Sequence, residues 1–319
     1  MDHKNIKLSI VAPMYNEEAV IGAFIDKTIE VLQANFHAYE LILVDDGSND
    51  DTVKICAQYL LKNKSIRIIV FSRNYGHEIA STAGLQHARG DYVVLMDSDL
   101  QHPPSLIPNM VDLAISENSD VVCAIRSNRD DEGWFKKTSA RLFYKFSRKM
   151  TGFNIIADAG NFRLLSRRVV ESLNKMKESN RHLIMMFAYI GYKTSYIEYH
   201  CQERLAGASK YTLRKLISLS LDSIIGFSSR PLRLMSIFSV MLSIIMMGYA
   251  GFILVEKLFS HKQLADGMAS LIFLISGLFS VLFLFLAIIS EYISRILIET
   301  KNRPLYNIKQ DLNSETIEH

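Results

Sequence analysis

The first 205 residues alternate short apolar runs with longer segments in which apolar residues recur every three or four positions. The apolar runs are almost continuous in Val, Ile and Leu, which is typical of strands covered on both faces. They occupy residues 6–13, 39–46, 66–71, 91–97 and 120–126. The segments between them have helical periodicity and occupy residues 17–36, 50–62 and 77–88. This alternation predicts an α/β domain with a mainly parallel sheet and helices on both faces.

From residue 230 the pattern changes to long apolar stretches. Residues 234–255 and 268–290 contain no charged side chain, and each is long enough to cross a bilayer core of about 30 Å as a helix. We therefore predict two transmembrane helices. The expected organisation is a globular domain at 1–205, a juxtamembrane helix region at 206–231, membrane helices at 232–256 and 267–293, and a polar tail at 294–319 that is loosely ordered after Tyr306.

The segment 209–231 places apolar residues at helical spacing and begins with Lys210, Arg214 and Lys215. It fits a helix docked on the globular domain and equally one lying in the lipid headgroup layer. Its position immediately before a predicted span favours the interface. Basic residues flank the spans on their outer sides, whereas Lys and acidic residues balance in the short connection between them. This bias predicts that the globular domain and both termini are cytosolic. The flanking residues are Arg230, Arg233, Arg295, Lys301 and Arg303.

The charge and the cysteine content exclude some classes of partner and site. The formal net charge is +3 with a pI near 8.6, without the concentrated basic face that nucleic-acid binding requires. We therefore expect no nucleic-acid partner. The three cysteines, Cys56, Cys123 and Cys201, are far apart, which predicts neither a zinc site nor a disulfide framework.

Two aspartates follow the fourth apolar run, in the stretch LMDSDLQHPP at 95–104. Asp alone is common in solvated turns. At the end of a buried strand, however, Asp97, Asp99 and the Gln101 carbonyl could supply oxygen ligands to Mg²⁺ or Mn²⁺, which would neutralise the two carboxylates and hold a diphosphate. His77, His87 and His102 lie on separate segments, which predicts surface or supporting histidines.

Polar clusters also follow the first two strands. Pro13, Tyr15, Asn16 and Glu17 follow the first strand, and the VDDGSND stretch with Asp45 and Asp46 ends the second. Helix capping and turn formation explain both clusters adequately. The carboxyl edge of a parallel sheet is, however, also where ligands bind, so the same residues could line a nucleotide pocket. The sequence has neither a P-loop nor G-x-G-x-x-G, so a bound diphosphate would depend on a metal ion.

Together these segments resemble the family 2 glycosyltransferases with a Rossmann-like GT-A fold. The resemblance extends through further segments in the same order, to nearly the whole chain. It is that of the polyprenyl-phosphate glycosyltransferases, the group that holds bactoprenol glucosyltransferases, the undecaprenyl-phosphate 4-deoxy-4-formamido-L-arabinose transferase and dolichol-phosphate mannose synthases. The matching segments lie at 71–85, 97–104, 156–170, 203–216, 227–234 and 291–306.

The resemblance implies roles for individual residues. Pro13, Tyr15, Glu17 and Asp46 would line the nucleotide pocket, and Asp97, Asp99 and Gln101 would hold the metal on the donor's diphosphate. Asp158 matches the group's proposed catalytic aspartate, although a capping or salt-bridging residue beside Arg163 is the alternative. The acceptor's phosphate would be bound by Arg126, Lys137, Arg204 and Lys210. Asn161 departs from the Asp that many relatives have, which leaves its sugar contact open.

The implied reaction is an inverting, metal-dependent transfer of one sugar to undecaprenyl phosphate on the cytosolic leaflet of a bacterial inner membrane. Relatives suggest UDP-glucose as donor, a homotetramer as assembly and a lipid-linked sugar for the cell envelope as product. UDP-formamido-arabinose, UDP-GlcNAc, UDP-GalNAc and GDP-mannose are alternative donors. Two other functions compete: a processive polysaccharide synthase, disfavoured because the chain has no Q-x-x-R-W motif, and a non-catalytic membrane adaptor.

Overall fold

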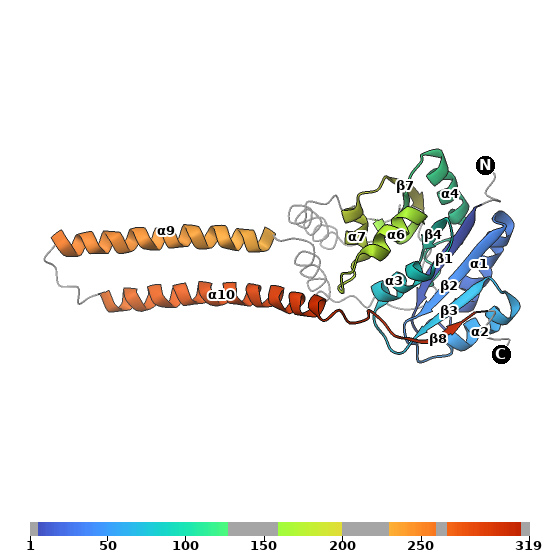
Figure 1. Cartoon of the computed structure of the whole chain (residues 1–319), viewed down its shortest axis with the longest axis horizontal. Coiled ribbons are helices and arrows are strands. Elements are labelled where there is room, and N and C mark those ends of the chain that lie inside the picture. Colours follow the sequence, from blue (N-terminus) through green and yellow to red (C-terminus); the bar gives the residue numbers. More distant parts are fainter. Residues whose placement is uncertain (1–5, 127–158, 200–229, 260–266, 314–319) are drawn as a thin grey trace.

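The computed structural model describes residues 6–126, 159–199, 230–259 and 267–313. A globular α/β domain carries two long helices that project from it side by side (Figure 1). The sheet of this domain has eight strands in the order β7-β5-β6-β4-β1-β2-β3-β8. Its strands are β1 Lys7–Met14, β2 Ala38–Asp45, β3 Ile66–Phe71, β4 Tyr92–Leu95, β5 Val121–Arg126, β6 Ala159–Ser166, β7 Thr194–Tyr199 and β8 Ile308–Leu312.

Most of the strands run in one direction. β1 is parallel to both β2 and β4, β2 is parallel to β3, and β5 is parallel to β7. The two strands that run in the opposite direction are β6, which lies between β4 and β5, and β8, which lies at the edge beside β3. The predicted α/β class with a mainly parallel sheet is therefore confirmed, with a mixed pattern at the β6 and β8 positions.

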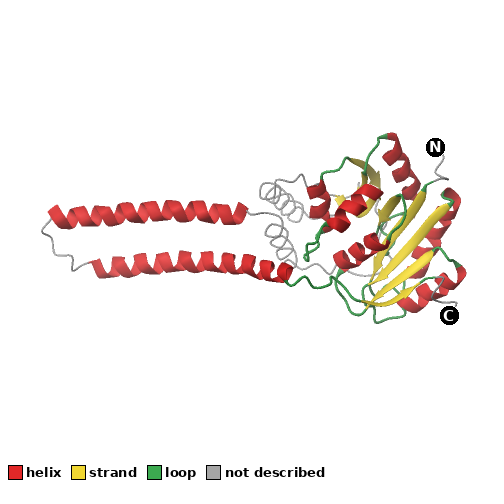
Figure 2. Ribbon diagram, in the orientation of Figure 1, coloured by secondary structure: helices red, strands yellow, loops and turns green. Residues whose placement is uncertain are grey.

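Helices cover both faces of the sheet (Figure 2). Alternate residues of β1 and β2 enter two separate apolar clusters, as the two-residue period of a strand requires. The first cluster lies under α1 Ile21–Asn35, α2 Thr52–Lys62 and α4 Ile107–Ser116. The second lies under α3 His77–His87, α6 Arg167–Lys175 and α7 Leu183–Ile190. The first three predicted helices are confirmed, although α1 begins at Ile21 and not at residue 17.

The two projecting helices are α9 Arg230–Phe259 and α10 Met268–Thr300. Within the described ranges, one stretch is long and apolar enough to cross a membrane, Gly277–Thr300 in α10, and it is not buried in the protein. A shorter apolar stretch, Leu234–Met246, lies in α9. One of the two predicted membrane spans is thus long and apolar enough to cross a membrane, and the second span stays a prediction. α10 also continues beyond the predicted end at residue 293, and the predicted juxtamembrane helix lies outside the described residues.

The C-terminal tail differs from the expectation of loose order. Residues 308–312 form β8, which pairs antiparallel with β3 and closes that edge of the sheet. The Arg67 guanidinium donates to both carboxylate oxygens of Asp311, at 2.9 and 2.6 Å. Hydrogen bonds from Arg67 hold the pKa of Asp311 below its usual range. The strand was not predicted because its polar sequence is shaped by an edge position and by a partner strand far away in the chain.

Candidate active site

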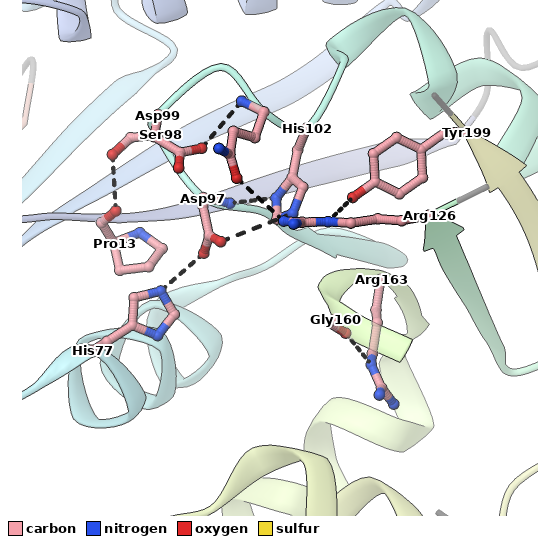
Figure 3. Close-up of polar contacts among 11 residues, drawn as sticks. Pro13, His77, Asp97, Ser98, Asp99, His102, Arg126, Gly160, Arg163 and Tyr199 are labelled. Carbon is pink, nitrogen blue, oxygen red and sulfur yellow. Dashed lines mark hydrogen bonds and ion pairs between the residues drawn. The ribbon is translucent and has the colours of Figure 1, made fainter. Parts of the chain in front are cut away.

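The polar side chains singled out in the sequence meet at one edge of the sheet. β1, β2, β4 and β5 all end at this edge, because β4 and β5 are each antiparallel to β6 and therefore run the same way. The edge receives the residues that follow β1, the Asp45–Asp46 pair of β2, Asp97 after β4 and Arg126 at the end of β5. The structure therefore brings these predicted residues together, as Figure 3 shows for the part around Asp97.

The turn that carries both aspartates is tightly held. Asp99 Oδ1 accepts a hydrogen bond from the Gln101 backbone N–H at 3.1 Å, and the Asp97 N–H donates to His102 Nδ1 at 2.9 Å. Leu100 lies in the left-handed region at φ 62°, which is costly for a leucine, and its side chain is buried in the core. Burial of Leu100 thus stabilises a strained turn that keeps the two carboxylates at the sheet edge.

Asp97 is surrounded by nitrogen donors. His77 Nε2, from the first residue of α3, lies 2.9 Å from Asp97 Oδ1, and His102 Nε2 lies 3.8 Å from Oδ2. Burial opposes ionisation of Asp97, but His102, His77 and Arg126 together outweigh it and hold the pKa of Asp97 well below its usual range. Burial would likewise lower the pKa of His77, but the hydrogen bond to Asp97 raises it to about 9. At neutral pH these two residues therefore form an ion pair.

His102 supports the turn from the protein interior. Its ring is almost completely buried, stacks on Phe162 at 4.9 Å and meets Tyr199 edge-on. Burial lowers the pKa of His102, against the opposing charges of Asp97 and Asp99. Because Nδ1 accepts the Asp97 N–H, a ring proton lies on Nε2, which faces the Asp97 carboxylate.

Arg126 joins the same cluster at the end of β5. Its Nε donates to the Tyr199 hydroxyl at 3.1 Å, and its Nη2 donates to Gln101 Oε1 at 3.3 Å. The Gln101 side-chain oxygen, which the sequence suggested as a metal ligand, therefore contacts a guanidinium. Arg126 places a permanent positive charge beside the two aspartates, where an anionic ligand would need it.

The two aspartates at the end of β2 are buried and have different surroundings. Asp46 accepts hydrogen bonds from the Tyr75 and Gly76 backbone N–H groups, at 2.6 and 2.9 Å. Asp45 Oδ2 accepts the Ser48 N–H at 3.0 Å, whereas its Oδ1 is buried with no hydrogen-bond partner among the described residues. Burial raises the pKa of both carboxyls. An unpartnered buried acceptor is costly, so Asp45 Oδ1 is suited to a donor supplied by a ligand.

The residues after β1 connect this edge to the neighbouring loop. The Pro13 carbonyl accepts a hydrogen bond from Ser98 Oγ at 3.1 Å, which ties β1 to the Asp97 turn. Asn16 exchanges hydrogen bonds with the loop after β2, and the Glu17 N–H donates to Thr52 Oγ1 at 2.9 Å. Tyr15 is exposed. These contacts tie the loop after β1 to its neighbours, whereas the Tyr15 ring lies at the surface.

The donor set fits a divalent cation that shares its coordination with a substrate. Within the described ranges, no group of three or more His, Cys, Asp and Glu side chains could enclose a metal ion. Asp97 and Asp99 offer two carboxylates on one turn, and Mg²⁺ is usually bound by one or two carboxylates together with substrate phosphates and water. A divalent cation at this turn would therefore need further oxygen ligands from the phosphates of a bound substrate and from water.

Four predicted site residues lie outside the described part of the chain, and two histidines have contacts that the sequence did not specify. Asp158, Lys137, Arg204 and Lys210 lie outside the described residues. His77 and His102, predicted as surface or supporting histidines, both contact Asp97 and so have the supporting place, although the sequence did not show which residue they support. Two signals in the sequence pointed to these contacts. His77 begins the helix that follows β3, and His102 comes five residues after Asp97. Tyr199 had none, because it reaches Arg126 only through the pairing of β7 with β5.

The chain is similar to known proteins over most of its length. The family model for Glycosyl transferase family 2 matches residues 9–173. An uncharacterized glycosyltransferase of Bacillus subtilis, YkcC, is 40% identical over 98% of this chain and 96% of its own length. The SfII prophage-derived bactoprenol glucosyl transferase of Shigella flexneri is 35% identical over 96% of this chain and 98% of its own length.

Solved structures support the fold. A mannosyltransferase from Pyrobaculum calidifontis, determined in complex with GDP-Man and Mn²⁺, superposes with a TM-score of 0.50 at 18% identity. The match covers 69% of this chain and 63% of that one. At this identity the likeness concerns the fold alone, and it agrees with the Rossmann-like GT-A sheet that the sequence predicted.

Proposed function

The chain belongs to glycosyl transferase family 2, and from this membership we propose that it transfers one sugar from a nucleotide donor to a polyprenyl phosphate on the cytosolic leaflet of a bacterial inner membrane. The observation that carries the proposal is the 35% identity to a bactoprenol glucosyl transferase over 96% of this chain, which includes the apolar helix region. UDP-glucose and undecaprenyl phosphate are the proposed substrates, and a homotetramer is the proposed assembly.

The edge residues have distinct parts in this proposal. Asp97 and Asp99, with Gln101 beside them, would hold Mg²⁺ or Mn²⁺, whose positive charge would stabilise the departing nucleoside diphosphate. The nucleotide would bind along the loops after β1 and β2, against Pro13, Tyr15, Asn16, Glu17, Asp45 and Asp46. The buried Asp45 Oδ1 supports this placement because a base or ribose could supply the donor that it lacks.

The acceptor needs cations more than it needs a base. A phosphomonoester has a second pKa near roughly 6, so a lipid phosphate is mostly dianionic at neutral pH and already nucleophilic. We propose that Arg126, Lys137, Arg204 and Lys210 bind this phosphate against the repulsion of the two aspartates. Asp158 would orient the acceptor or remove a residual proton. A single displacement at the anomeric carbon would invert its configuration.

A transfer assay distinguishes this proposal from its competitors. The purified full-length protein in detergent would be incubated with Mn²⁺, undecaprenyl phosphate and each of a panel of labelled nucleotide sugars. A lipid-linked monosaccharide is the expected product, formed fastest with UDP-glucose. A polymer would favour a processive synthase, and no turnover with any donor would favour a non-catalytic adaptor. A faster reaction with another donor would change the sugar and leave the reaction class intact.

The membrane topology is part of the proposal, and chain connectivity supports it. β8 comes after α10, yet it pairs with β3 in the sheet to which the N-terminal strand β1 belongs. The chain therefore belongs to the same globular domain before α9 and after α10. If α10 crosses the membrane, the chain must cross the membrane a second time to return to this domain. α9, with its 30 residues and about 45 Å of helix, supports the second crossing.

We predict opposite labelling of two introduced cysteines in intact cells. In a variant with Cys56, Cys123 and Cys201 replaced by Ser, Gln263→Cys lies in the connection between the two helices and should react with a membrane-impermeant maleimide. Lys309→Cys in β8 should react only after the membrane is permeabilised. Labelling of Lys309→Cys in intact cells, or protection of both positions, would contradict the two-span topology.

A further inference from the structure

The segment that follows the membrane helix returns to the first turn of α3. Residues 299–312 leave the end of α10, run along the globular domain and end in β8 (Figure 1). Besides the β8–β3 pairing, this segment makes two separate sets of contacts. One set reaches Tyr75, and the other reaches Glu78 through an intermediate loop.

The first set is direct. Asn307 Nδ2 donates to the Tyr75 hydroxyl at 2.9 Å, and the Asn307 carbonyl accepts the Ser72 N–H at 3.0 Å. The Tyr306 ring stacks on Phe71 with 4.8 Å between centroids, and its hydroxyl donates to Gln86 Oε1 at 2.6 Å. The loop between β3 and α3 is therefore fixed to the tail at its start and at Tyr75.

The second set passes through the loop between α6 and α7. The Glu299 carboxylate accepts hydrogen bonds from the Ser179 N–H at 2.8 Å and from the Ser179 hydroxyl at 3.0 Å. The same loop continues to Leu183, whose N–H donates to Glu78 Oε2 at 3.1 Å. Glu78 is the second residue of α3, so the last turn of α10 is linked to the start of α3 from the other side.

The residues at the start of α3, from the loop residue Tyr75 to His77, in turn contact the candidate active site. The Tyr75 and Gly76 N–H groups donate to Asp46, and His77 contacts Asp97. Gly76 has a φ of 103°, a conformation that residues with a side chain rarely adopt. The tail is thus connected with Asp46 by two successive hydrogen bonds, from Asn307 to the Tyr75 hydroxyl and from the Tyr75 N–H to Asp46. The neighbouring His77 contacts Asp97.

We propose that Asn307, in the segment 299–312, is a positioning residue of the donor site, which fixes Tyr75 and thereby the backbone donors of Asp46. The proposal rests on the proposed function, because it assigns a role toward the nucleotide donor. Its alternative is that the tail only covers the exposed edge of β3, a role that β8 and the Arg67–Asp311 pair fulfil without Asn307.

The test separates these roles with two substitutions that both remove the hydrogen bond between Asn307 and Tyr75. Tyr75→Phe also removes the contact of the Tyr75 hydroxyl with Ser72 Oγ at 3.1 Å, which Asn307→Ala keeps. Asn307→Ala should weaken the binding of UDP in the presence of Mn²⁺ by about three- to tenfold, the effect of one lost hydrogen bond, and Tyr75→Phe should weaken it at least as much. Because Asn307 acts through the Tyr75 hydroxyl, the double variant should bind no more weakly than Tyr75→Phe alone. Calorimetry on the full-length protein in detergent measures the binding. Hydrogen exchange of the Tyr75 and Gly76 amides should be faster in each variant.

Lys309→Ala is the matched control, since Lys309 is exposed in the same strand. It should leave both readouts unchanged. Wild-type affinity for UDP and unchanged exchange in Asn307→Ala would overturn the proposal and leave the tail as an edge cover. Neither readout requires an acceptor, so failure of lipid transfer would count against the proposed function alone. If the wild-type protein did not bind UDP, the exchange rates at Tyr75 and Gly76 would still decide whether the tail positions this turn.

Discussion

Replacing Asp99 by Asn is expected to lower the rate of sugar transfer by about a thousandfold, because charge stabilisation by a bound metal ion contributes several kcal/mol. Asn retains a side-chain oxygen that can accept the Gln101 N–H, so the turn should persist while the negative charge is lost. Loss of activity would then report on cation binding and not on misfolding. The measurement is the initial rate of lipid-linked sugar formation across a Mn²⁺ titration, in which the variant should need far more Mn²⁺.

The control for this substitution is Asp51→Asn. Asp51 is exposed, and the contact of its carboxylate is a long surface ion pair with Lys54 at 3.8 Å. Its backbone hydrogen bonds do not depend on the side-chain charge, so Asp51→Asn should leave the rate and the Mn²⁺ requirement unchanged. Chelator treatment of the wild-type protein should mimic Asp99→Asn, and added Mn²⁺ should restore the activity. Full activity of Asp99→Asn in chelator-treated samples would contradict a metal-dependent reaction at this turn.

The sheet and its ligand-binding edge were predictable because both depend on local patterns. Strands such as β2 contain consecutive apolar residues, at 41–44, and burial on both faces leaves few other arrangements for them. Once the strands are parallel, their carboxyl ends share one edge, and the polar residues after each strand must meet there. The strand pattern alone therefore predicts that Asp46 and Asp97 lie at this edge of the sheet.

What escaped prediction depends on contacts between distant parts of the chain. β8 follows the long apolar helix α10 and has a polar sequence, yet it pairs with β3 more than 230 residues earlier. His77 was predicted as a surface or supporting histidine, but its contact with Asp97 could not be predicted because the two residues lie on separate segments. The ion pair forms only because α3 lies close against β1 and β2, which brings its first residue to the end of β4. Pairing between residues far apart leaves no periodic pattern in a single sequence.

That close approach of α3 leads to the largest expected effect on stability. Gly84 faces the sheet, and a Cβ at this position would lie 2.2 Å from Val11 Cγ1 and 3.2 Å from Val44 Cγ2. Gly→Ala inside a helix ordinarily stabilises it by about 1 kcal/mol. Here the β-branched neighbours are stiff and buried, so overpacking of about 3 kcal/mol should prevail. Gly84→Ala should therefore destabilise the domain by about 2 kcal/mol, or about 4–8 °C in Tm.

Gly22→Ala provides the matched comparison in α1. Its added Cβ would lie 3.4 Å from the Tyr59 hydroxyl, an ordinary contact with the end of a side chain, so the helix propensity of Ala should decide and Tm should rise slightly. Both variants are measured by thermal unfolding of the full-length protein in detergent. Because α3 carries His77, Gly84→Ala should also weaken the binding of UDP with Mn²⁺, whereas Gly22→Ala should not. An equal response of the two variants would show that α3 can move away from β1 without cost, and the fixed position of His77 beside Asp97 would lose its structural basis.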